Sequence, residues 1–107
     1  MSLDFPEEDW LRLHQIRPHA IERLCKKAIH QIAEIQRMPH LSKHDAYLKI
    51  SDLVRQEDRA IEAAFGTPKR TNAIRQIRLM IQQGILTPAE ISSFTKETQI
   101  RVELDTE

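Results

Sequence analysis

The chain has little cysteine, glycine or aromatic content: its 107 residues include one Cys, two Gly and only 5% Phe, Trp and Tyr. The single Cys25 cannot form an internal disulfide. Neither glycine has a second one nearby, so the sequence excludes a glycine-rich phosphate-binding loop. It also lacks the ~20 consecutive apolar residues of a membrane-spanning helix. No early basic stretch leads into the apolar run of a signal peptide, so we expect a cytoplasmic protein that is not embedded in a membrane.

The chain has no excess of either charge, with 16 Lys and Arg against 16 Asp and Glu. A zero net charge gives no whole-molecule attraction to nucleic acid, so binding of a polyanion would need a local basic patch. The charges are unevenly placed along the chain. Residues 66–84 carry four basic and no acidic residues, whereas residues 85–107 carry two basic and five acidic residues. These two segments are therefore expected to attract each other, within one chain or between copies.

Apolar residues at helical spacing dominate what remains. They predict an all-α, compact bundle of about five helices, two short and three longer, in a single domain covering residues 1–107. The clearest stripe runs from Ile21 through Cys25, Ala28 and Ile32 to Ile35. The expected helices cover residues 5–16, 18–37, 43–65, 68–83 and a segment that starts after Thr87.

Capping residues and prolines set these boundaries. Pro18 cannot donate the amide proton of a continuing helix, so we expect a break or kink there. Ser42 is the expected N-cap of the helix over 43–65, and Pro68 the first residue of the helix over 68–83. Thr87, Pro88 and Glu90 form the best capping box in the sequence. Residues 99–105 alternate like a strand, although i,i+4 spacing of opposite charges favours helix.

One charged residue departs from the apolar pattern. Glu57 lies three residues after Val54 and four before Ile61, near the middle of an apolar helix face. A carboxylate there is costly unless it is paired or solvated. We therefore expect Glu57 to form an ion pair inside the fold, with Arg70 as the candidate partner, or else to fix the register of a helix dimer.

The residue pattern predicts no catalytic residue, no metal site and no cofactor, and hence a protein that is not an enzyme. Five His and one Cys are present, but His40 and His44 flank a helix cap and do not share one helical face. Cys25 lies in the middle of a helix on an apolar stripe, where a thiol acts as a small hydrophobic group. No small-molecule substrate is evident from the sequence.

Two kinds of partner remain open. The first is protein: broad isoleucine stripes and few aromatic residues favour a self-associating interaction or regulatory module, as a homodimer or with another protein. The expected interface or buried polar residues are Glu57, Leu79, Ile100, Val102 and Leu104.

The second kind of partner is nucleic acid. The helix over 68–83 could act as the recognition helix of a helix-turn-helix-like regulator, because a short link at Gly66-Thr67 precedes it. Its candidate phosphate-binding residues are Lys69, Arg70, Arg75 and Arg78. Four positive charges are a small footprint for DNA, so we rank this alternative below a protein partner.

Overall fold

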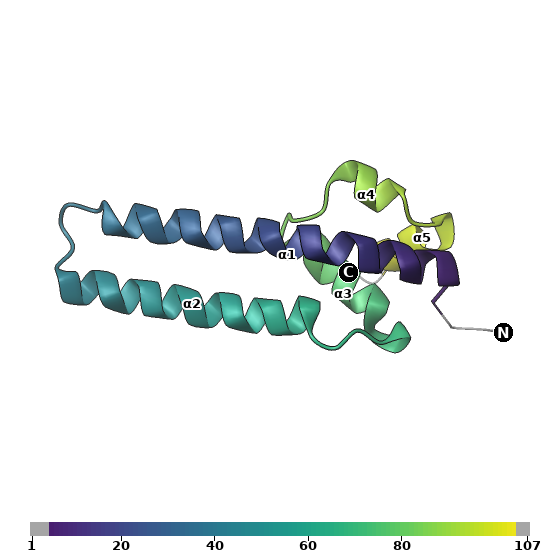
Figure 1. Ribbon diagram of the computed structural model, residues 1–107, viewed down its shortest axis with the longest axis horizontal. Coiled ribbons are helices and arrows are strands. Elements are labelled where there is room, and N and C mark those ends of the chain that lie inside the picture. Colours follow the sequence, from purple (N-terminus) through teal and green to yellow (C-terminus); the bar gives the residue numbers. More distant parts are fainter. Residues whose placement is uncertain (1–4, 105–107) are drawn as a thin grey trace.

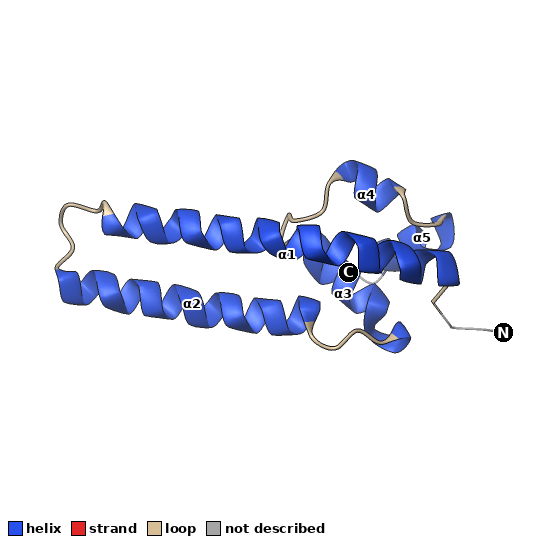
Figure 2. Cartoon of the chain, viewed as in Figure 1, coloured by secondary structure: helices blue, strands red, loops and turns tan. Residues whose placement is uncertain are grey.

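A computed structural model describes residues 5–104 of the chain, and every regular element in that range is helical. This confirms the all-α prediction for the described residues. Figures 1 and 2 show two long antiparallel helices with shorter helices gathered at one end. The elements are α1 (Glu7–Gln36), α2 (Lys43–Phe65), the 3-10 turn η1 (Arg70–Asn72), α3 (Ala73–Gln82), α4 (Pro88–Ser92) and α5 (Lys96–Leu104).

The expected break at Pro18 is wrong, because α1 runs through it for 30 residues. A proline inside a helix removes one backbone hydrogen bond and costs about 3 kcal/mol relative to alanine. Tertiary contacts on the neighbouring turns offset this cost. Ile16 and Ala20 are buried, and the Arg17 guanidinium donates to the carbonyl of Phe65 at 2.8 Å. Pro18 itself is exposed, so its ring interferes with no packed neighbour.

The prediction for residues 43–65 is confirmed, because α2 has those bounds. Ser42 is its N-cap, and its hydroxyl accepts a hydrogen bond from the backbone amide of Asp45 at 3.0 Å. The helix ends at Gly66, whose amide donates to the carbonyl of Glu62. A short connection over residues 37–42 joins α1 to α2, so the two long helices form an antiparallel hairpin (Figure 1).

The helix expected over 68–83 begins later than Pro68. The side chain of Asn72 explains the delay: its Oδ1 accepts from the Lys69 amide at 3.0 Å, and its Nδ2 donates to the carbonyl of Thr67 at 3.3 Å. These bonds hold a turn that competes with a regular helix start. The chain therefore passes through η1 before α3 begins, and α3 has 10 residues.

Helix α3 ends in a Schellman motif. The Ile85 amide donates to the carbonyl of Met80, and the Gly84 amide donates to that of Ile81. Gly84 has a φ of 70°, the left-handed conformation that this motif requires. Both Met80 and Ile85 are buried, so the turn aims the following chain back across the core towards α1.

The capping box predicted at Thr87 is confirmed: the Thr87 hydroxyl accepts from the Glu90 amide, and a Glu90 carboxylate oxygen accepts from the Thr87 amide. The same carboxylate accepts from both terminal guanidinium nitrogens of Arg23 from α1, at 2.7 and 3.0 Å. Hydrogen bonding to Arg23 holds the pKa of Glu90 below its ordinary value. This ion pair fastens the short α4 to α1.

Residues 96–104 form helix α5, which resolves the helix-or-strand alternative in favour of helix for the described part of that segment; residue 105 lies outside the described range. Asp9 of α1 sets where α5 begins. Its Oδ1 accepts from the Thr95 amide at 2.9 Å, and its Oδ2 accepts from the hydroxyls of Thr95 and Thr98 at 2.6 and 2.5 Å. The first helix therefore fixes the N-terminus of the last.

Within residues 5–104, all fully buried apolar side chains lie in one half of the molecule, which we call the head. They come from Phe5, from α1 up to Leu24, from Ala64 at the end of α2, and from the segment after it. The remaining hairpin, residues 25–63, forms the arm, and no residue in it is fully buried. Because the arm projects from the head, the molecule measures 58 × 25 × 23 Å.

The expectation of a compact bundle is therefore wrong. The radius of gyration of 16.7 Å exceeds the roughly 13 Å of a compact domain of this length. The proportions also differ from two short and three longer helices: two helices are long, and the other three have 10, 5 and 9 residues. Helices α3 to α5 are too short to reach along the hairpin, so they cover only its base.

Candidate interaction surfaces

The arm carries an apolar groove along one side of the hairpin. Near the base, a hollow of about 210 Å³ lies between α1 and α2, and Cys25, Ile29, Val54 and Ile61 are among its lining residues. Towards the tip, a second hollow of about 290 Å³ is lined by residues that include Met38, Leu41, Tyr47 and Ile50. The lining of both hollows is mainly aliphatic or aromatic.

Helical spacing places these residues on one face of the arm. At 100° per residue, Tyr47, Val54 and Ile61 lie within one narrow sector of α2, and Cys25, Ile29 and Ile32 lie within one sector of α1. The shared lining of the basal hollow shows that the two sectors adjoin. We call this surface the arm face; its residues are Cys25, Ile29, Ile32, Tyr47, Val54 and Ile61.

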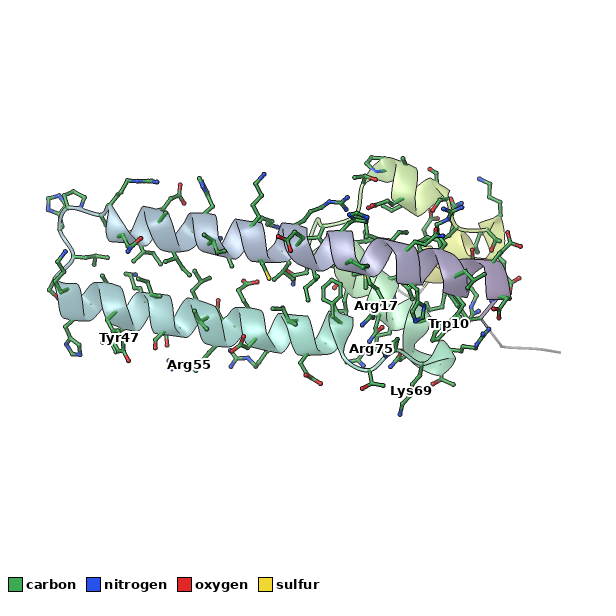
Figure 3. The ribbon with its side chains drawn as sticks, in the orientation of Figure 1. Trp10, Arg17, Tyr47, Arg55, Lys69 and Arg75 are labelled. Atoms are coloured by element: carbon green, nitrogen blue, oxygen red, sulfur yellow. The ribbon has the colours of Figure 1, made fainter. Side chains whose placement is uncertain are left out.

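Large apolar side chains on the arm face remain accessible to solvent. Ile29 is 66% exposed, Tyr47 67% and Val54 42%. Figure 3 shows that side chains, Tyr47 and Arg55 among them, project from α2 along the arm where no other helix lies. The row from Ile21 to Ile35 is half-buried by α2, so the hairpin covers only part of its own apolar surface.

The structure divides the predicted interface residues. Val102 is buried in the head, and Leu79 is half-buried against the same core, so their packing is internal. Ile100 and Leu104 are exposed on α5. Glu57 is half-buried and lines the basal hollow of the arm. It does not pair with Arg70, which binds Glu7 instead.

The predicted basic residues do not form one open patch. The Arg70 guanidinium lies 2.6 Å from a carboxylate oxygen of Glu7, and its carbon lies 4.9 Å from the centre of the Trp10 ring. Arg78 is half-buried in the head. Lys69 and Arg75 are exposed and line one hollow, on the side of the molecule where α2 meets α3.

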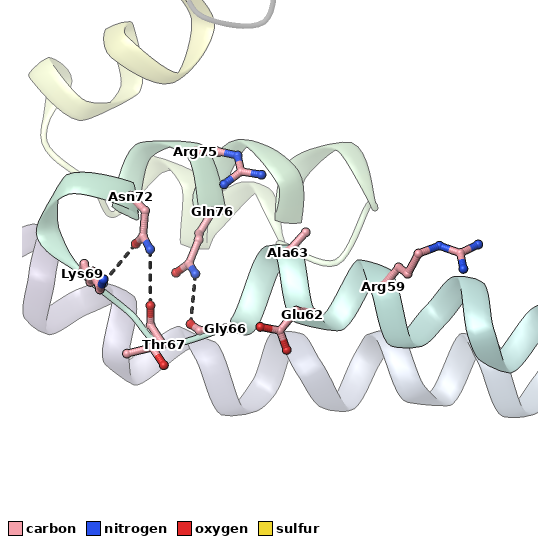
Figure 4. A pocket seen from close by; sticks show the side chains of 9 residues that line it. All are labelled: Arg59, Glu62, Ala63, Gly66, Thr67, Lys69, Asn72, Arg75 and Gln76. Carbon is pink, nitrogen blue, oxygen red and sulfur yellow. Dashed lines mark hydrogen bonds between the residues drawn. The ribbon is translucent and has the colours of Figure 1, made fainter.

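Lys69 and Arg75 line an open polar hollow of about 520 Å³ together with Arg59 of α2. Figure 4 shows the three cations around the α2–α3 connection, with the carboxylate of Glu62 below them. Among residues 5–104, neither Arg59 nor Arg75 forms an ion pair. Arg59 was not expected from the sequence, because it lies on another helix and only the fold brings it to residues 69 and 75.

Buried polar groups beside this hollow hold the head together. Gln76 is 3% exposed; its amide nitrogen donates to the carbonyl of Gly66 at 3.0 Å, and its oxygen accepts from Arg17 at 3.1 Å. Burial lowers the pKa of Arg17, whose guanidinium also lies over the Phe65 ring. These contacts join α1, the end of α2 and α3. Gln76 and Arg17 therefore stabilise the head and do not form part of an open surface.

The described part of the chain contains no group of three or more His, Cys, Asp or Glu side chains placed to hold a metal ion. It also contains no helix long and apolar enough to cross a membrane. Comparison of the chain with protein-family models, with curated proteins and with solved structures finds no match.

Proposed function

We propose that this chain is a non-enzymatic protein-interaction module that binds a protein partner on the arm face. One observation carries the proposal: the exposed large apolar side chains concentrate on the arm. Five of the eight such residues within the described range lie between residues 25 and 63, namely Ile29, Met38, Tyr47, Leu48 and Val54, and three of these, Ile29, Tyr47 and Val54, lie on the arm face. Large exposed apolar side chains gathered on one face are typical of a protein interface.

The physical reason lies in how the arm is stabilised. Two helices packed only against each other bury one seam, and most helical stability in proteins comes from packing of the apolar face. A partner on the arm face would extend that seam and remove Ile29, Tyr47 and Val54 from water. The polar groups Asp9, Gln76 and Glu90 of the head do not need a partner in the same way, since they are hydrogen-bonded within the fold.

Affinity capture from native cell extract, with and without nuclease, tests this function. The tagged wild-type chain should retain a protein partner, a second copy of the chain included, after nuclease treatment. The Ile29→Gln, Val54→Gln double variant should lose it, because two apolar contacts become polar. Leu11→Gln is the matched control, since Leu11 is also exposed, at 56%, but lies outside the arm. Retention by the arm variant, or loss on nuclease treatment, contradicts the proposal.

The polar hollow favours a second candidate function, binding of a nucleic-acid phosphate backbone. Arg59, Lys69 and Arg75 place three cations against the one carboxylate of Glu62. Such binding would weaken as salt rises, with a slope set by the number of phosphates contacted. Arg59→Gln with Arg75→Gln should flatten that slope in a mobility-shift titration. A wild-type chain that shifts neither duplex nor single strand at low salt rules this candidate out.

A further inference from the structure

We propose that the partner on the arm face is a second copy of this chain, packed antiparallel, so that two arms form a four-helix bundle. The inference rests on the proposed function and specifies its partner. In this assembly α2 lies against α2 of the copy, α1 lies against α1 of the copy, and the two heads lie at opposite ends. Closed two-fold pairing of this kind is the commonest symmetry of soluble oligomers.

Two charged residues on α2 favour the antiparallel direction. Lys43 lies at the tip end of α2 and Asp58 at its base, both on the side of the arm face by helical spacing. In a parallel two-fold arrangement α1 of one copy lies against α2 of the other, so Lys43 of one copy does not meet Asp58 of the other. An antiparallel arrangement places Lys43 of one copy near Asp58 of the other, twice.

The apolar residues give the same register. The midpoint between Tyr47 and Val54 falls between Ile50 and Ser51, and the midpoint between Lys43 and Asp58 falls at the same place on α2. A two-fold axis at that point therefore places Tyr47 on Val54 of the copy and Lys43 beside Asp58 of the copy in one alignment. The exposed ring of Tyr47 then packs on the partly exposed side chain of Val54 of the copy. The pairs of Lys43 and Asp58 lie farther from the two-fold axis than these apolar contacts.

The size of the surface sets the strength of the pairing. At ~1.5 Å per residue, the stretch from Lys43 to Ile61 is about 27 Å long, and two helices side by side are about 20 Å wide. The footprint is roughly 540 Å² per copy, below the roughly 800 Å² of a standard stable interface. We therefore expect a reversible dimer that forms with rising concentration, in line with an arm that folds in the monomer.

Cysteine cross-linking of the full chain tests the orientation. In a Cys25→Ala background, Ser51→Cys lies next to the two-fold axis and should form a covalent dimer on mild oxidation. Tyr47→Cys is the matched control: it lies on the same face, but about 10 Å along α2 from its own copy, beyond disulfide reach. A covalent dimer in Ser51→Cys alone supports the proposal. Equal cross-linking of the two variants, or none in either, overturns the antiparallel register.

Charge exchange tests the same register without cysteine. Lys43→Glu should raise the dissociation constant several-fold, because it meets Asp58 of the copy, and the added Asp58→Lys should restore it. A double variant no tighter than the single one overturns the pairing. If the chain stays monomeric while the arm variants still lose a captured protein, the second copy is refuted and the proposed function stands. If capture is also unaffected by those variants, both are refuted.

Discussion

Removal of the Asp9 carboxylate should destabilise the head more than any other single polar change. Asp9 is 1% exposed and accepts three hydrogen bonds, two from Thr95 and one from Thr98, which is fully buried. These bonds link the start of α1 to the start of α5. Replacement by alanine leaves the Thr98 hydroxyl without this acceptor in the interior.

The size of the effect follows from the burial and charge of these bonds. Hydrogen bonds to a charged group contribute about 1.5–3 kcal/mol each, and loss of the carboxylate also relieves part of its desolvation cost. We expect Asp9→Ala to lower the free energy of unfolding by about 3 kcal/mol. For a domain of this size that corresponds to a fall in Tm of roughly 12 °C or more.

Urea unfolding at one fixed protein concentration measures this loss, since dimerisation makes apparent stability concentration-dependent. Thr98→Val serves as the second corner of a double-mutant cycle, because valine keeps the shape and removes the hydroxyl. The cycle should give a coupling energy of about 1–2 kcal/mol between Asp9 and Thr98. A coupling near zero, or an Asp9→Ala loss below about 1 kcal/mol, would refute the proposed link between α1 and α5.

Three further changes test other parts of the head. Glu90 has a lowered pKa in the fold, so its pairing with Arg23 stabilises the protein above the unfolded pKa of about 4.3, and this stabilisation is lost as the pH falls through the folded pKa. The difference in unfolding free energy between wild type and Glu90→Gln should therefore shrink when urea titrations move from neutral to acidic pH. A difference that stays constant with pH speaks against the pairing. Pro18→Ala should stabilise α1 by about 2 kcal/mol, because the side chain is exposed and the backbone regains a donor; a loss of stability in thermal unfolding would mean that the proline is required. Gly84→Ala should cost about 1 kcal/mol or more, because Gly84 has φ of 70°, and an unchanged Tm would contradict this.

Local capping chemistry made part of the fold predictable. The bounds of α2 follow from Ser42 and Gly66, and the start of α4 follows from the Thr87 capping box, because these signals act between residues a few positions apart. The continuity of α1 through Pro18 did not follow, since it depends on Arg17 reaching the end of α2. The start of α5 depends likewise on Asp9, which lies 86 residues before Thr95.

The candidate surface was predictable only in outline. The apolar stripes of α1 and α2 can be read from their spacing, but which stretch stays open depends on where α3 to α5 end, and only the fold shows that they stop at the base. Val102 and Leu79 looked available for a partner and instead pack in the head. Arg70 looked available for phosphate and instead pairs with Glu7, because the chain returns to its own N-terminal end.

The most direct test of the arm face as a self-association surface is sedimentation equilibrium across a wide concentration range. Burial of the remaining exposed parts of Ile29 and Val54 contributes about 2 kcal/mol per chain, or roughly a thousand-fold in the dimer dissociation constant. The wild-type mass should rise from 12.5 kDa towards twice that value, as should that of Leu11→Gln, while the Ile29→Gln, Val54→Gln variant stays at 12.5 kDa. A wild-type mass of 12.5 kDa at every concentration, or dimerisation of the arm variant, would contradict the account.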